Sequence, residues 1–152
     1  MTDHTVRAYD RELGALGRRI AEMGGIAEQM LSDAMDALAK LDTELATRTI
    51  AIDPRLDALQ REIEDNAILT IARRQPMAVD LRECVAAIRV SGDLERVGDL
   101  AKNIAKRAAK IAAEARLPRG IVGLRSMHEL AALQLKDVLD AYLRGEQPDF
   151  RA

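Results

Sequence analysis

Aromatic side chains are almost absent from this sequence. They make up 2% of its 152 residues, and tryptophan does not occur at all. A small-molecule pocket is normally lined by apolar side chains, many of them aromatic. The aliphatic, alanine-rich composition therefore favours close packing of helices and lowers the expectation of an enzyme with a deep substrate pocket.

The sequence also has little net charge, a single cysteine and no long apolar segment, and each of these limits the class of protein. The net charge is only −2, so the whole chain has no strong attraction for nucleic acid. The single cysteine, Cys84, has no partner for an internal disulfide, which fits a reducing compartment and favours a small core residue. No apolar run of 18 residues and no signal-peptide pattern is present. We therefore expect a cytoplasmic protein that binds no nucleic acid.

The residues of a catalytic centre are also missing. His4 lies near the chain start, and His128 lies on an expected helix with no Ser, Cys or Asp arranged around it. The sequence contains no glycine-rich phosphate-binding loop. We therefore predict that the protein is not an enzyme.

What the sequence does contain is helical periodicity. Apolar residues recur at helical spacing in four segments, at about 2–40, 44–73, 76–115 and 121–144. No segment alternates like a strand, so the predicted fold class is all-α. Short turns join the first three segments, which predicts an antiparallel three-helix bundle over residues 1–116. A linker near residues 117–120 leads to one additional helix in 117–152.

Several positions leave alternatives open. At Gly24-Gly25, either another helix crosses closely or the first helix bends. Asp53-Pro54 favours a kinked second helix, or one that restarts with Asp53 as its cap. Asn66, on the apolar side of that helix, is interpreted as a register-setting polar contact. The fourth helix has a stripe made of Leu124, Met127, Ala131, Leu135, Val138 and Tyr142.

The third segment carries an acidic pair. Its apolar stripe is Val90, Leu94, Val97, Ala101, Ile104, Ala108 and Ile111. At 100° per residue, Glu95 and Asp99 fall opposite this stripe and one turn apart, where like charges repel. Ion pairs with Arg96, Lys102 or a basic residue of the next helix would compensate them. A bound hard cation is the other explanation.

Four stretches of the sequence together resemble the PhoU family of phosphate-signalling proteins. They are AYDRELGALGRRIAEMG, RLDALQREIEDNAILTIARRQP, RRQPMAVDLR and DLERVGDLAKNIAKRA. The joint pattern QPxAxDLR followed by DLERxGDxAxNIA is specific, and the resemblance covers essentially the whole chain.

The resemblance implies a fold and a function. PhoU-like proteins are two tandem three-helix bundles, and here the second bundle would be represented by its first helix alone. They are non-catalytic regulators that restrain the phosphate-starvation response. The implied partners are the ATPase subunit of the phosphate ABC transporter and a membrane-bound sensor histidine kinase. These partners would place the protein in the cytoplasm, peripheral to the inner membrane.

The resemblance also implies a metal site. The third helix of each PhoU-like bundle carries an E/D-x-x-x-D motif that can hold iron, zinc or other divalent cations. In this chain the motif carries over to Glu95 and Asp99. By helical rotation, Asp57 and Glu64 face away from the apolar stripe of the second helix, and of these two Asp57 is the additional ligand we expect. The oxygen donors favour iron, manganese or magnesium, and a closed zinc site is disfavoured without His or Cys nearby.

Three other residues of the motif segment, Asp93, Arg96 and Asn103, are supporting candidates. Asp93 and Asn103 lie toward the helix flank, where we expect contacts with neighbouring helices.

This chain departs from the family in helix number, with four helices where a whole member has six. It is either a fragment or a short natural variant, and we expect its fourth helix, 121–144, to pair with another copy in a homo-oligomer. Two hypotheses result. The first is a metal-binding phosphate-signalling regulator that acts by protein contacts. The alternative is a non-catalytic helical adaptor or oligomerisation module without a functional metal site.

Overall fold

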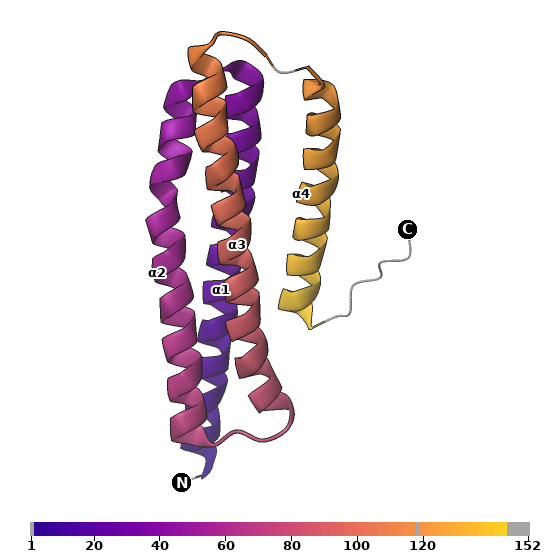
Figure 1. The fold of residues 1–152 in the computed structure, drawn as a ribbon. Coiled ribbons are helices and arrows are strands. Elements are labelled where there is room, and N and C mark those ends of the chain that lie inside the picture. Colours follow the sequence, from indigo (N-terminus) through magenta and orange to yellow (C-terminus); the bar gives the residue numbers. More distant parts are fainter. Residues whose placement is uncertain (1, 118, 146–152) are drawn as a thin grey trace.

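The computed structural model describes residues 2–117 and 119–145, with side chains from Tyr9 onward. Its helices are α1 (Thr2–Lys40), α2 (Thr43–Arg74), α3 (Val79–Ala113) and α4 (Ile121–Arg144), and no strand occurs in these residues. Helices α1, α2 and α3 lie side by side, and α4 runs along the outside of this bundle, against α1 (Figure 1). The predicted all-α helical bundle is confirmed. No helix in the described ranges is long and apolar enough to cross a bilayer.

The helix boundaries have local causes. Asp42 caps α2, because its carboxylate accepts a hydrogen bond from the Leu45 N–H at 2.9 Å. Helix α2 then continues through Pro54 to Arg74, so the restart that the sequence allowed does not occur. Helix α3 begins at Val79 and not at Pro76 as predicted. Gln75 is in the left-handed helical conformation (φ 49°, ψ 54°), and Ala78 has φ 52° with ψ −110°; these two non-helical residues separate the helices.

The core is aliphatic and surrounds α1. The helical spacing of apolar residues in the first segment predicts a buried stripe on α1, and its members from Leu16 to Ala37 are all buried: Leu16, Ile20, Met23, Ala27, Met30, Ala34 and Ala37. Cys84 is buried as expected. Asn66 is exposed, because its neighbour Ala67 occupies the buried position, so the predicted polar contact is wrong. Helix α2 contributes Leu56, Leu59, Ile63 and Ala67 to the core.

The buried face of α3 is rotated from the predicted stripe. Val90, Val97, Ile104 and Ile111 are only partly buried. Small residues, Ser91, Gly98 and Ala105, are buried in their place, beside the correctly predicted Leu94, Ala101 and Ala108. Small side chains at these positions allow α3 to approach its neighbours closely. As a consequence Glu95 and Asp99 lie at the edge of the core beside α2, not opposite the core.

Helix α4 packs on the bundle through a face that overlaps the predicted stripe only in part: Leu135 and Tyr142 of the stripe pack against the core, beside Leu139, which was not predicted. Leu139 is buried, and a Cβ added to Gly24 would lie 2.8 Å from its Cδ1. Gly24 therefore marks a close helix crossing, which was one of the two alternatives. Much of the predicted stripe, including Leu124, Met127 and Val138, is exposed, because α4 rests on one neighbour and can bury only one narrow face.

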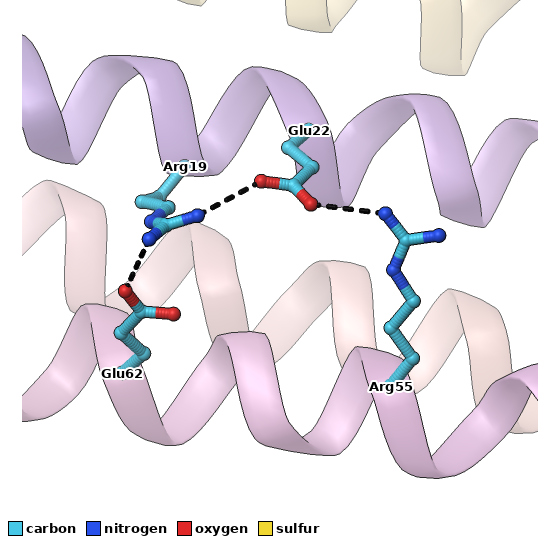
Figure 2. Close-up of polar contacts among 4 residues, drawn as sticks. All are labelled: Arg19, Glu22, Arg55 and Glu62. Atoms are coloured by element: carbon cyan, nitrogen blue, oxygen red, sulfur yellow. Dashed lines mark hydrogen bonds and ion pairs between the residues drawn. The ribbon is translucent and has the colours of Figure 1, made fainter.

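A chain of ion pairs joins α1 to α2 on the outer surface (Figure 2). Arg19 contacts Glu22 of its own helix at 3.1 Å and Glu62 of α2 at 2.6 Å. Arg55 of α2 contacts the same Glu22 at 3.0 Å. Such exposed pairs contribute little energy individually. Linked in a row, they favour one lengthwise register of α2 on α1, and that register helps to set which α2 residues face α3.

Candidate functional site

The predicted metal ligands meet where α2 faces α3. Glu95 and Asp99 are one turn apart on α3, and Asp53 and Asp57 are one turn apart on α2. The negative charges of Asp57, Asp99 and Asp53 all act on the Glu95 carboxylate. The structure thus brings Asp57 near Glu95 and adds Asp53. We call these four residues the carboxylate cluster.

Lys102 supplies positive charge to the carboxylate cluster. Its Nζ lies 2.8 Å from Asp53 Oδ2 on α2 and 2.7 Å from Asp99 Oδ1 on its own helix. The side chains of Lys102 and Asp53 are only 19% and 15% exposed, so water screens this pair weakly. The hydrogen bonds to Asp53 and Asp99 raise the pKa of Lys102, and the bond from Lys102 lowers the pKa of Asp99. The predicted ion pair in which Lys102 compensates the negative charge of Asp99 is therefore confirmed.

Glu95 has no comparable partner. Within the described part of the chain it forms neither a hydrogen bond nor an ion pair. Burial, and then the charges of Asp57 and Asp99, raise the pKa of Glu95. Glu95 and Asp57 are thus the two members of the carboxylate cluster that form no ion pair with a described residue, and the charge of Lys102 offsets the effects on Glu95 only in part.

The carboxylate cluster suits a hard cation in donor type, since carboxylate oxygens are the ligands preferred by magnesium, manganese and iron. Its arrangement is not that of a preformed site. Among the residues with described side chains, no three His, Cys, Asp or Glu are grouped so as to hold a metal ion. Lys102 also occupies the position between Asp53 and Asp99. Metal ligation by Glu95, Asp99 and Asp57 therefore stays a prediction.

The supporting candidates lie outside the carboxylate cluster. Asp93, Arg96 and Asn103 are exposed, and none of them forms a hydrogen bond or ion pair with a described residue. Asp93 and Asn103 therefore make no polar contact with a neighbouring helix in the described residues, although Asn103 lines a hollow with Leu31 of α1 and Leu135 of α4. The rotation that buries Ser91 and Gly98 turns this flank of α3 outward.

Asp53 was missed as a member of the site, because its position before Pro54 suggested a helix cap. The feature of the sequence that could have identified Asp53 is its spacing from Asp57. Asp53 and Asp57 repeat on α2 the one-turn separation of Glu95 and Asp99 on α3.

Similarity to known proteins identifies the family of this chain. Residues 20–108, which include the Glu95–Asp99 motif, match the family of the PhoU domain. The chain belongs to the PhoU family. The resemblance noted in the sequence is thereby confirmed.

Relatives of known name support the same assignment. Over 140 residues the chain is 52% identical to the phosphate-specific transport system accessory protein PhoU homolog of Rhizobium meliloti, covering 91% of this chain and 59% of the relative. The Caulobacter vibrioides homolog is 49% identical over 146 residues, which cover 96% and 64% of the two chains. The chain thus spans about three fifths of the length of these relatives.

The fold agrees with a solved PhoU structure. The crystal structure of PhoU from Pseudomonas aeruginosa superposes with a TM-score of 0.87 at 34% sequence identity. The match covers 90% of this chain and 65% of that one. The arrangement of helices described above is therefore that of the matched part of a PhoU protein.

Proposed function

We propose that this chain is a non-enzymatic accessory regulator of phosphate uptake that acts by contacts with other proteins. The observation that carries the proposal is its identity of 52% and 49% to accessory proteins of the phosphate-specific transport system, over more than nine tenths of the chain. The close packing of aliphatic helices suits a scaffold better than a catalyst.

The partners proposed are the ATPase subunit of the phosphate transporter and a membrane sensor histidine kinase. Through these contacts the chain would restrain the phosphate-starvation response from the cytoplasmic side of the inner membrane. Large apolar side chains exposed at two places support a role in binding: Met77 and Val79 before and at the start of α3, and Val122 and Met127 on α4.

Binding of the purified chain to the ATPase subunit of a phosphate transporter tests this proposal. Biolayer interferometry would compare that subunit with the ATPase subunit of an unrelated ABC importer, and would include the cytoplasmic part of the sensor kinase. We expect saturable binding to the phosphate-system proteins alone. In cells that lack their own PhoU-family gene, the chain should lower a phosphate-starvation reporter. Failure in both assays would favour the adaptor hypothesis.

Metal binding is a separate part of the proposal. We propose that Glu95, Asp99 and Asp57 hold a divalent or trivalent cation such as iron, zinc, manganese or magnesium. The oxygen donors support it, as does the Glu95 carboxylate, which lies among other carboxylates and forms no ion pair with a described residue. The test is elemental analysis of the metal-loaded protein beside the Glu95→Ala/Asp99→Ala variant. Stoichiometric metal in the parent alone supports the site; metal in neither would leave Lys102 as the compensating charge.

The alternative, a helical adaptor or oligomerisation module, is favoured by α4. Val122, Met127, Leu130 and Leu133 are each more than half exposed on this helix. We propose that residues 121–144 pair with another copy of the chain, which would bury this apolar surface. Light scattering coupled to size-exclusion chromatography measures the mass directly. A strictly monomeric species at micromolar concentrations would contradict the pairing.

A further inference from the structure

The first turns of α3 form an apolar groove that no described part of the chain covers. The groove has a volume of about 470 Å³ and is lined by Leu81, Arg82, Val85, Ala86, Arg89 and Val90. In Figure 1 the start of α3 lies at the end of the bundle, and farther along α3 Ala86 also lines a separate hollow with Tyr142 and Gly145 at the end of α4. Helix α4 packs on α1 and not on α3.

Exposed apolar side chains surround this groove. Leu81 and Val85, in the groove itself, are 38% and 36% exposed, and Met77 and Val79, just before it, are 82% and 64% exposed. Ala78, between Met77 and Val79, has φ 52° and ψ −110°, a conformation that costs energy in a residue with a Cβ. Strain of this kind, next to side chains that water solvates poorly, is typical of binding surfaces.

On the first turns of α3, the basic residues lie on the groove side and the acidic residues lie on the side toward α1. Arg82 and Arg89 are exposed, line the groove and form no ion pair or hydrogen bond with a described residue. The acidic residues of the same turns, Asp80 and Glu83, lie toward α1, where they help burial to raise the pKa of Tyr9 to about 12. The groove side of α3 is thus apolar, with two positive charges that no described residue pairs.

We propose that this groove binds an acidic amphipathic helix of a partner protein. The apolar face of that helix would rest on Leu81 and Val85, and its carboxylates would pair with Arg82 and Arg89. The two arginines are seven residues apart, which is two helical turns or roughly 10.5 Å. Carboxylates seven residues apart on a partner helix match this distance. The inference rests on the proposed function only in that the chain works by protein contact.

The geometry favours a helix over an anionic membrane. Attraction to a membrane grows with the number of basic residues at the surface, and only two arginines line this groove. A hollow running along α3 also complements a rod better than a flat bilayer. A second copy of the chain is less suited as well, because the exposed surface of α4 carries Arg125 and Lys136 beside Glu129 and Asp137.

Fluorescence anisotropy with designed peptides tests the proposal on the full chain. The probe is a labelled 18-residue amphipathic helix with leucines on one face and glutamates seven residues apart beside them. A second peptide replaces the glutamates by lysines, and a third scrambles the order. We expect the acidic peptide to bind the parent protein, more weakly as sodium chloride is raised, and the other two not to bind.

Charge reversal provides the decisive variants. The Arg82→Glu/Arg89→Glu variant should bind the acidic peptide at least roughly tenfold more weakly than the parent does. The same variant should bind the lysine peptide, which the parent does not bind. The matched control, Arg61→Glu/Arg125→Glu, makes the same change in net charge at exposed arginines away from the groove and should bind as the parent does. Val85→Asp should abolish binding of the acidic peptide, and circular dichroism checks that each variant is folded.

Four results would overturn the proposal. They are failure of the acidic peptide to bind, unchanged binding in the Arg82→Glu/Arg89→Glu variant, binding to anionic phosphatidylglycerol vesicles in place of the peptide, and self-association that Val85→Asp removes. The test is separate from that of the proposed function. A groove that binds the peptide in a protein that ignores the ATPase subunit and the kinase would refute those partners and leave the groove intact.

Discussion

Gly98 of α3 lies directly against Leu56 of α2: a Cβ on Gly98 would come within 2.1 Å of Leu56 Cδ2. Real side-chain atoms do not approach this closely. The glycine inside the Glu95–Asp99 motif therefore has a packing role, because it lets the helix that carries the two acids approach the helix that carries Asp53 and Asp57.

Gly98→Ala should destabilise the bundle by about 1–3 kcal/mol, because the added methyl group forces Leu56 or α3 to move. Urea unfolding followed by circular dichroism measures the change. Gly25→Ala is the matched control on α1. It has open space around the new Cβ, so helix propensity alone should stabilise it by about 0.5–1 kcal/mol. Equal effects in the two variants would refute close packing at Gly98.

Lys102→Met should lower the thermal midpoint at neutral pH, because it leaves Asp53 and Asp99 without their shared cation. The Lys102 bond lowers the pKa of folded Asp99, so this stabilisation is complete above the ordinary value of 3.8 and is lost as the pH falls through the lowered value. The difference between variant and parent should therefore shrink in acid. Lys110→Met, at an exposed position farther along α3, should show no such pH-dependent difference.

Glu95→Gln should stabilise the protein at pH 7. Burial and neighbouring carboxylates raise the pKa of Glu95, so the folded state holds its proton more tightly than the unfolded state does. Stability therefore falls as the pH rises from the ordinary value of 4.5 through the raised one, and glutamine removes that loss. Thermal melts from pH 4 to 8 measure it. Glu114→Gln, exposed at the end of α3, is the control, and a lower midpoint for Glu95→Gln than for the parent would contradict the expectation.

Leu139→Ala should loosen α4 without unfolding the other helices. Leu139 is buried against Gly24, and deletion of such a side chain costs about 2–5 kcal/mol. Hydrogen exchange should accelerate through Ile121–Arg144 and stay slow in the buried parts of α1, α2 and α3. Leu133→Ala, on the exposed side of the same helix, should leave the exchange of α4 unchanged. Uniform acceleration over all four helices would show that α4 is part of one cooperative unit.

The sequence by itself determined the helices, their order and the family. Helical periodicity is a local property that depends on spacing along the chain, so the α1 stripe from Leu16 to Ala37 and the α2 stripe could be predicted. Rotation also indicated that Asp57 faces away from the apolar stripe of its own helix, but its nearness to Glu95 depends on how α2 and α3 face each other.

Only the tertiary structure decided how the helices face one another. The rotation of α3 depends on Ser91, Gly98 and Ala105, whose small size gives a weak apolar signal in sequence but permits close approach in space. That rotation brought Glu95 and Asp99 beside α2 and placed Lys102 between Asp99 and Asp53. The face of α4 that packs on α1 was likewise set by the surface at Gly24, because periodicity marks apolar stripes and only a partner's shape selects which one is buried.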